Sequence, residues 1–378
     1  MDHQNGSGAD AAGNPVRWQR TRRAGDRLLR AVTAVAWWGL ALWMALAVFF
    51  TAPLPVWVTV PLTIAIMGLY YVARREWDTL RDLAGRPWKE KYRTTAALSI
   101  TALFAVWYLG FVSPDPNQDW APEQARMPIV TIEGDKIHVK DVRNFTWHSA
   151  TEFTPGFYER VYDLSKLNSM YYVVAPIPIK DMKFVAHVFV CFGFSDGQHV
   201  AVSVEGRRVK GRPYRLIPSL FRQYQLIYVV GDERDVVGLR GAIWNQPVFF
   251  YPARTTTERK RAIFRDMMQR AHDLEEEPEF YHLIVNNCMT NITGHIRRLG
   301  GHSLPHDLRL LLTGLSDRVA YRLGYIDTDL PFASARQAFR IDRWMEQTPL
   351  DAGFSKRLRE RIRQQVAQAR QKLADKRR

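Results

Sequence analysis

The sequence predicts an α+β protein in which an antiparallel sheet and a cysteine-bearing helix follow three helices that cross a membrane. Two observations lead to this fold class. Roughly the first third of the 378 residues holds three uncharged apolar stretches. The remainder begins with short apolar runs bounded by turn residues and continues with segments in which apolar residues recur every three or four positions. Strands grouped before helices are typical of the α+β class.

The apolar stretches are Ala31–Phe50, Pro53–Ala73 and Thr94–Val112. Each has roughly the 20 residues that the core of a bilayer requires. A cleaved signal peptide would end at a small-residue site and would not be followed by two more stretches. Buried helices of a globular core rarely lack a polar face three times in succession. We therefore expect three transmembrane helices between residues 31 and 112.

The net charge of +15 is concentrated around these stretches. One basic cluster precedes the first stretch, a second lies between Arg74 and Arg93, and a third forms the C-terminal tail. This placement follows the positive-inside rule and argues against a nucleic-acid partner. It predicts a multi-pass membrane protein whose later part lies outside the cytoplasm. In a bacterium this would be a protein of the inner membrane with that part in the periplasm. The predicted parts are a cytoplasmic N-terminus (1–30), an anchor (31–112), a periplasmic domain (113–350) and a basic C-terminal helix or tail (351–378).

Several strands are expected in the periplasmic domain. A hairpin around Glu133-Gly134-Asp135 is predicted within residues 129–142, and a loop rich in aromatic and charged residues is expected to follow and to end near Asp163. The clearest hairpin has Ser195-Asp196-Gly197 as its turn, with glycine at the left-handed position. The remaining predicted strands, including both arms of that hairpin, are Tyr171–Ala175, Phe184–Phe194, His199–Glu205, Gln225–Val230 and Val248–Tyr251.

Helical spacing of apolar residues marks two later segments, Thr257–Leu274 and Cys288–Leu299. A third helix is expected from Ser355 onward, where an apolar stripe runs through a strongly basic segment. That stripe is compatible with a solvated helix or frayed tail, and equally with a helix that lies on anionic lipid. The sequence leaves both alternatives open.

The register of the clear hairpin places His187 directly opposite Glu205, on one face of the sheet. A carboxylate in that position could orient the imidazole and stabilise its charged form, as the third member of a catalytic triad does. A register shifted by one residue would send Glu205 to the opposite face. Packing of a lone histidine beside a lone glutamate is the alternative.

Cys288 follows Asn286-Asn287 at a predicted helix start, where free N–H groups and the helix dipole lower the pKa of a thiol. The same N–H groups, with Asn287 and Met289, could bind an oxyanion or substrate. A disulfide with Cys191, the only other cysteine, is the alternative in an oxidising compartment, and an inert thiol is the third. His187 and Cys191 lie about 13 Å apart along a strand. Disulfide-bonded Cα atoms lie within about 7 Å of each other. Cys288 therefore cannot readily form a disulfide with Cys191 and also contact His187.

Other polar clusters are less specific. The run from Gly231 to Asp235 is rich in charge and could line a cleft or form a turn with ion pairs. His295, His302 and His306 lack the spacing of known metal sites. We therefore expect neither a metal nor a cofactor.

Several of these motifs, in this order, resemble the Lnb-type periplasmic domain, a family named after bacterial lipoprotein N-acyltransferases. The motifs are the strand around His187, Ser203-Val204-Glu205, the run from Gly231 to Asp235, and Asn286-Asn287-Cys288. The resemblance extends from about Asp119 to Gly324. It differs in that the family's named enzymes carry their membrane helices after this domain. More distantly, the order of histidine and cysteine is similar to permuted papain-like proteins of the NlpC and lecithin:retinol acyltransferase type.

The resemblance implies Cys288 as nucleophile, His187 as its base and Glu205 as the third residue. It further implies a thiol acyltransferase that takes an acyl chain from a membrane phospholipid and passes it to the N-terminal amine of a lipoprotein. A thiol amidase or peptidase acting on peptidoglycan, and a non-catalytic binding domain of the same fold, are the alternatives. An acyltransferase predicts an apolar groove beside Cys288 that opens toward the membrane, whereas a peptidase predicts a polar, exposed cleft.

Overall fold

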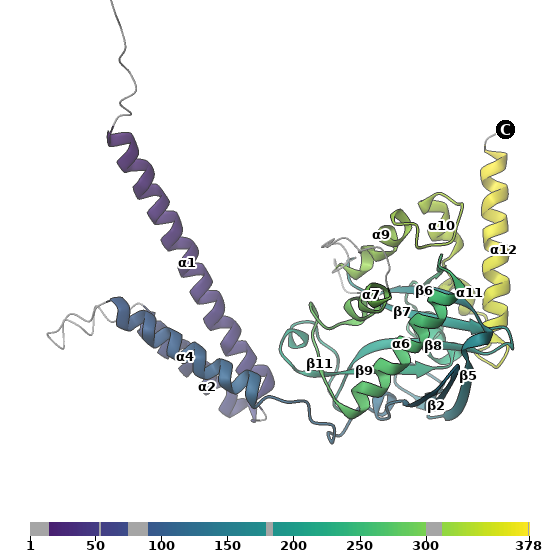
Figure 1. Cartoon of the computed structure of the whole chain (residues 1–378), viewed down its shortest axis with the longest axis horizontal. Helices are drawn as coiled ribbons and strands as arrows, with labels where there is room; N and C mark the ends of the chain where they lie inside the picture. The colour runs from purple at the N-terminus through teal and green to yellow at the C-terminus, as the bar shows by residue number, and fades with distance from the viewer. Residues whose placement is uncertain (1–14, 53, 75–89, 179–183, 300–311, 377) are drawn as a thin grey trace, which may run out of the picture. The chain divides into compact units, whose positions relative to one another are not determined.

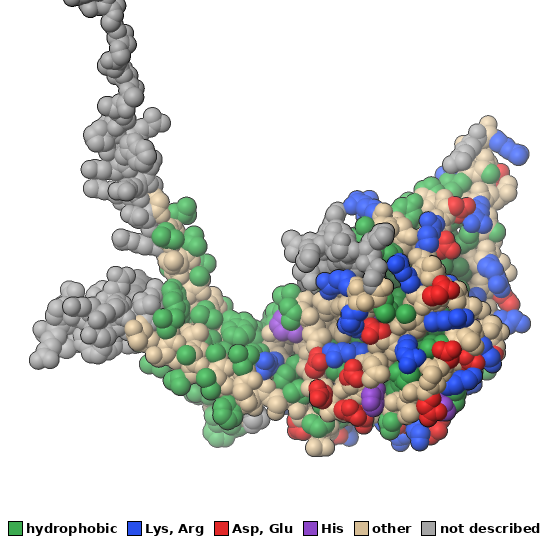
Figure 2. Space-filling model, viewed as in Figure 1, with side chains coloured by type: hydrophobic (Ala, Val, Ile, Leu, Met, Phe, Trp, Pro, Cys, Tyr) green, Lys and Arg blue, Asp and Glu red, His purple; other side chains and the backbone are tan. Residues whose placement is uncertain are grey.

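The computed structural model describes residues 15–52, 54–74, 90–178, 184–299, 312–376 and 378, and the chain divides into two units, Met1–Val112 and Ser113–Arg378. The described helices of the first unit are α1 (Pro15–Thr51), α2 (Val56–Arg74) and α4 (Glu90–Gly110). Within that unit they pack through a small cluster that includes Ala41, Tyr70 and Ala97. Most of the other large apolar side chains are exposed, as the green surface of this unit in Figure 2 shows.

One described helix is long and apolar enough to cross a membrane, and its apolar part spans Ala31–Thr51. The apolar parts of α2 and α4, Val56–Tyr71 and Thr95–Gly110, are shorter. The structure therefore shows one candidate span among the described residues. The expectation of three transmembrane helices remains a prediction.

The second unit is built on a mostly antiparallel sheet, which confirms the mixed α+β class. Its main path runs β1-β2-β9-β8-β7-β6-β10, with β5 paired to β2 and β11 paired to β9. The strands are β1 (Ile129–Glu133), β2 (Lys136–Arg143), β5 (Phe157–Asp163), β6 (Leu167–Pro176), β7 (Ala186–Phe194), β8 (His199–Arg207), β9 (Tyr224–Gly231), β10 (Phe249–Pro252) and β11 (Phe280–Tyr281). A separate short pair joins β3 (Thr146–Trp147) and β4 (Phe153–Thr154).

Strand β5 lies where the sequence predicted only a loop. Its residues pair with β2 in antiparallel fashion, from Phe157 opposite Arg143 to Asp163 opposite Lys136. Most of its side chains are exposed or half-buried, so the alternation of apolar and polar residues that marks other strands is absent here. The prediction of a loop was wrong for this reason.

The hairpin of β7 and β8 has the predicted register. Its pairs run from Gly193 opposite His199 to Phe189 opposite Ser203, and Gly197 at the turn has φ +87°. That angle lies in the left-handed region that glycine adopts without strain. Beyond Phe189 and Ser203 the two strands stop pairing with each other, although each still pairs with its other neighbour. The hairpin therefore parts at the end that carries His187 and Glu205.

Helices cover both faces of this sheet (Figure 1). On one face, Phe264 of α6 (Thr257–Glu276) makes an edge-on contact with Phe192 at 4.9 Å, and α7 (Cys288–Arg298) packs beside it. Arg359 of α12 (Phe354–Asp375) lies over the ring of Tyr171 on the other face, where α5 (Glu233–Gly238) also packs. Smaller helices follow α7, namely α9 (Ser316–Arg322), α10 (Phe332–Ala338) and α11 (Asp342–Met345).

Helix α12 belongs to the core of the second unit. Phe354 and Leu358 are fully buried, and the rest of its apolar stripe packs against the same core. Arg359 donates two hydrogen bonds to the buried carboxylate of Glu233, at 2.7 and 2.9 Å. The first half of the stripe is therefore occupied by the protein's own core, whereas Val366, Ala369 and Leu373 in its second half are only half-buried.

Candidate active site

Cys288 is the first residue of helix α7, as the sequence predicted. Asn287 caps the helix, because its side-chain oxygen accepts a hydrogen bond from the Thr290 amide at 2.9 Å while the Thr290 hydroxyl accepts one from the Asn287 amide at 2.8 Å. The Asn287 side-chain amide donates to the Leu283 carbonyl. These contacts fix the helix start. They use the Asn287 side-chain oxygen and one of the two N–H groups of its amide, so Asn287 positions the helix start and its oxyanion role stays a prediction.

The Cys288 side chain is buried beside strand β7. Burial raises the pKa of its thiol, while the backbone amides of Val188 and Met289 hydrogen-bond to the sulfur and act in the opposite direction. Val188 is the residue after His187, so Cys288 lies at the same end of β7 as the candidate base, but the two side chains share no hydrogen bond among the described residues. Both cysteines are free, and Cys191 contacts Glu233 instead. The disulfide alternative is therefore not what the structure shows.

His187, Ser203 and Glu205 form a chain of polar contacts at the parted end of the hairpin. Nε2 of His187 lies 2.7 Å from the Ser203 hydroxyl, which donates to Oε1 of Glu205 at 2.8 Å. His187 Nε2 and Glu205 Oε1 are 3.8 Å apart, so the serine hydroxyl connects them. His187 and Glu205 therefore lie close together as predicted, although their residues are not a paired position of the two strands and a hydroxyl lies between the two side chains.

The single hydroxyl proton of Ser203 determines the tautomer of the imidazole. A carboxylate only accepts hydrogen bonds, so the hydroxyl proton must point to Glu205. The Ser203 oxygen then accepts from His187, which places the imidazole proton on Nε2. Nδ1 has no hydrogen-bond partner among the described residues, and its lone pair is free to take a proton from a nucleophile.

Arg240 and Gln124 hold Glu205 in place. Arg240 donates to Oε1 at 3.1 Å from a π-helical turn, Leu239–Ile243, and Gln124 donates to Oε2 at 2.9 Å. Burial alone would raise the pKa of Glu205, but the neighbouring Arg240 cation lowers it below its ordinary value. Burial and Arg240 lower the pKa of His187 to about 3, against the opposing effect of Glu205. The resting site therefore holds a neutral imidazole, an ionised glutamate and a protonated thiol.

Sequence reasoning missed Arg240 and Gln124, and it named Ser203 only as part of a motif without giving it a role. The alternation that assigned Glu205 to the face of His187 also assigns Ser203 to it, two positions earlier on the strand. That signal was present. Arg240 and Gln124 lie in short irregular helices without a periodic pattern, so no sequence signal connected them with Glu205.

The charged run after β9 forms buried ion pairs. Asp235 receives two hydrogen bonds from Arg143, at 2.9 and 3.0 Å, and Glu233 is paired with Arg359. The run is therefore a structural turn and not the lining of a cleft. His295 contacts Asp266 and Tyr228, whereas His302 and His306 lie outside the described residues. Within the described ranges, no group of three or more metal-ligating side chains occurs.

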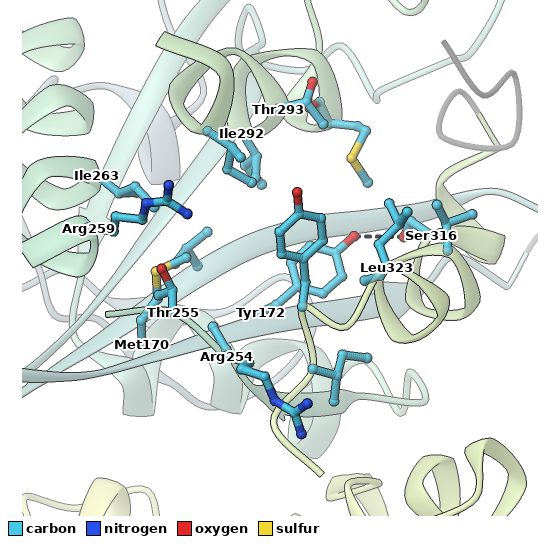
Figure 3. A pocket seen from close by; sticks show the side chains of 18 of the residues that line it. Met170, Tyr172, Arg254, Thr255, Arg259, Ile263, Ile292, Thr293, Ser316 and Leu323 are labelled. Carbon is cyan, nitrogen blue, oxygen red and sulfur yellow. Dashed lines mark hydrogen bonds between the residues drawn. The ribbon is translucent and has the colours of Figure 1, made fainter. Parts of the chain in front are cut away.

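An apolar cavity lies beside helix α7, whose Ile292 and Thr293 are part of its lining (Figure 3). Met289, the neighbour of Cys288, lines it together with Tyr172, whose hydroxyl donates to Ser316 at 2.7 Å. The cavity lies among β6, β7, α6, α7 and α9, has a volume of about 100 Å³ and opens to solvent on one side. Its other walls are largely aliphatic and include Met170, Val190, Ile263, Ile292, Ile296, Val319, Ala320, Leu323 and Ile326.

Comparisons with known proteins support one family. Residues 154–314 match the family described as the Lnb N-terminal periplasmic domain, and this match confirms the resemblance predicted from the sequence. The matched range includes β7, β8 and the start of α7. A search of curated proteins found no match, and a search of solved structures found none either.

Proposed function

Because the chain carries an Lnb-type periplasmic domain after an N-terminal apolar helix that fits a membrane anchor, we propose that it is a thiol acyltransferase of the bacterial inner membrane. The proposed anchor has three spans, with the N-terminus in the cytoplasm. The acyl donor is a membrane phospholipid, and the acceptor is the N-terminal amine of a lipoprotein. The proposal assigns a permuted papain-like architecture to the domain.

In the first half-reaction, Cys288 attacks the ester carbonyl carbon of the phospholipid. Nδ1 of His187 takes the thiol proton as the C–S bond forms, because it is the ring nitrogen without a proton. The carbonyl oxygen becomes an oxyanion, for which the amides at the start of α7 are the available donors. The C–O bond then breaks, the lyso-phospholipid oxygen takes the proton from His187, and a thioester remains on Cys288.

The second half-reaction reverses these roles. The amine of the acceptor attacks the thioester carbonyl and gives its proton to His187. The C–S bond breaks, the sulfur of Cys288 recovers the proton, and an amide forms. Glu205 is ionised throughout and stabilises the imidazolium through Ser203.

The apolar cavity beside Met289 is the observation that carries this assignment. An acyl group bound to Cys288 needs an apolar site for its chain. The cavity volume of about 100 Å³ is below the roughly 300–1,000 Å³ of a usual ligand pocket, so a long chain would also occupy the open mouth. A peptide or glycan substrate would need polar partners along the cleft instead. The walls here are aliphatic side chains from three helices and the sheet.

The test is the intact mass of the protein after incubation with phospholipid. We expect the full-length protein, purified in detergent, to gain one acyl group on Cys288 that hydroxylamine removes. Cys191→Ala is the matched control, because the Cys191 thiol is fully buried on the face of the sheet that α5 covers. This substitution should leave the adduct unchanged. Absence of an adduct on the native protein would contradict the proposal.

A second measurement separates transfer from hydrolysis. Adding a lipopeptide with a free N-terminal cysteine should move the acyl group to the peptide amine. Release of free fatty acid at the same rate with and without the peptide would assign the site to a hydrolase.

A further inference from the structure

The loop between β8 and β9 is basic and carries an exposed apolar tip. Residues 208–222 contain five lysines and arginines and no acidic residue. Lys210, Arg212 and Arg215 are exposed and make no ion pair with any described residue, whereas Arg208 is paired with Glu123. Ile217 in the same loop is 60% exposed. Unpaired cations around an exposed aliphatic side chain are typical of surfaces that meet a membrane.

The turn that leads into the nucleophile helix exposes two further apolar side chains. Ile284 is 49% exposed and Val285 is 70% exposed. The turn is held by its own backbone, because His282 and Asn286 exchange two hydrogen bonds at 2.9 and 3.0 Å. Nδ1 of His282 accepts from the amides of Ile284 and Val285. The fold therefore presents these side chains outward on an ordered turn without packing them.

The loop and the turn are joined to each other and to Cys288. The Leu283 amide donates to the Ser219 carbonyl at 2.9 Å, which links the turn to the basic loop two residues from Ile217. The side-chain amide of Asn287 donates to the Leu283 carbonyl, and Cys288 is the next residue. Two hydrogen bonds, together with short stretches of the chain, thus connect the loop and the turn with Cys288.

We propose that this surface, defined by Lys210, Arg212, Arg215, Ile217, Ile284 and Val285 and called here the docking lip, binds an anionic phospholipid bilayer. Isolated exposed apolar residues need no explanation, but these three lie on two turns joined by a hydrogen bond, and Ile217 lies in the loop that carries the unpaired cations. Ile284 and Val285 border a polar hollow that includes Asp266, Arg270 and Asp273. The charge complements the anionic head groups of a membrane surface. This proposal rests on the proposed function, because it describes how a lipid of the bilayer would reach Cys288.

Insertion of the lip is measurable without acyl transfer. Val285→Cys on a Cys288→Ser background is labelled with an environment-sensitive fluorophore, and the full chain is reconstituted into nanodiscs that contain phosphatidylglycerol. We expect a blue-shifted emission that brominated lipids quench. The same label at Lys140→Cys, an exposed position on β2, should show neither effect.

Charge dependence identifies the occupant. Lys210→Gln, Arg212→Gln and Arg215→Gln together, or nanodiscs of phosphatidylcholine alone, should reduce the quenching by at least half. Equal quenching of the fluorophore at positions 285 and 140 would overturn the proposal that the docking lip enters the bilayer. A blue shift that appears only when a lipopeptide is added would also overturn it, because the surface would then bind the acceptor.

An activity measurement separates this proposal from the previous one. Ile284→Ser with Val285→Ser should slow acylation of Cys288 by nanodisc lipid about fivefold or more, and should leave acylation by a soluble short-chain ester unchanged. Loss of both reactions would indicate a damaged site. If the native protein transfers no acyl group, the function is wrong while the insertion result still stands on its own.

Discussion

Ser203 shows how one hydroxyl can set the chemistry of a histidine. It lies between His187 and Glu205, with contacts of 2.7 and 2.8 Å, and places the imidazole proton on Nε2. In a triad with direct contact, the carboxylate performs this task itself. Here Arg240 and Gln124 hold the carboxylate of Glu205, and the Ser203 hydroxyl lies between it and His187. The tautomer of His187 therefore depends on that hydroxyl.

Ser203→Ala should therefore lower kcat about 10- to 100-fold, the loss typical of removing a group that orients a catalytic ligand. KM should change little, because Ser203 does not line the cavity. Ser203→Thr keeps the hydroxyl and should restore most of the rate. A loss in Ser203→Ala that appears only in KM or in thermal stability would contradict the positioning role.

His187 should also make stability depend on pH. Its pKa is about 3 in the folded protein, against an ordinary value of 6.5, so the unfolded chain binds a proton in this window and the folded chain does not. Folding stability should fall as pH falls from about 6.5, by up to about 1.4 kcal/mol per pH unit from this residue. Denaturant unfolding of the full chain in detergent at pH 6.5, 5.5 and 4.5 measures it.

His187→Gln is the matched variant for that measurement. It should lose less stability than the native protein over the same range, which lies above or at the ordinary pKa of Glu205. Parallel curves for the two proteins would show that His187 is not held neutral.

The parts of the candidate site that depend on a single turn or helix start were predictable from the sequence. Gly197 fixed the register of one hairpin, and that register brought His187 close to Glu205. Asn287 and Thr290 marked the start of α7. Arg240 was not predictable, because a π-helical turn has no sequence periodicity and its contact with Glu205 spans 35 residues.

At the scale of elements, the parted end of the β7–β8 hairpin makes room for the site. Pairing stops after Phe189 and Ser203, and the start of α7 lies against β7 at Val188. The order of strands before helices was predictable from the sequence. Strand β5 and the short helices α9 to α11 were not, because contacts with the rest of the fold determine them. Their sequences lack a strong period because they are only partly buried.

Helix α9 forms one wall of the cavity, and filling that wall should change the preferred acyl chain. Ala320→Phe places a ring in the space between α9 and α7. We expect acylation by donors with 16-carbon chains to fall more than about 10-fold relative to donors with six carbons, as a filled apolar pocket discriminates by size. Rates measured over a series of chain lengths decide this.

Ala320→Ser is the control, because it changes polarity by one hydroxyl and hardly changes volume. An unchanged chain-length profile in Ala320→Phe would place the acyl chain elsewhere.

At the scale of the whole molecule, the positive charge is not gathered into one patch on the visible face of the second unit. Figure 2 shows basic and acidic side chains interspersed over that face. Much of the net charge of +15 lies instead in the segments that flank the apolar stretches and in the C-terminal segment. This distribution is the basis for the predicted orientation.

Reporter fusions test the orientation and the number of spans. Alkaline phosphatase fused after Pro55, Glu90 and Ser113 should be active, inactive and active, respectively, because the enzyme folds only outside the cytoplasm. Activity should also be high for a fusion at Arg378. High activity of the Glu90 fusion would mean that α2 does not return to the cytoplasm and would contradict three spans.

The ion pair between Arg359 and Glu233 makes folding of the second unit depend on its last helix. Glu233 opens α5, directly after the central strand β9, and is fully buried. Its partner lies 126 residues later, on a helix that follows every other described element. A buried carboxylate without its cation destabilises a fold by several kcal/mol. The core of the second unit can therefore close only after nearly all of the chain, including α12, is available to fold.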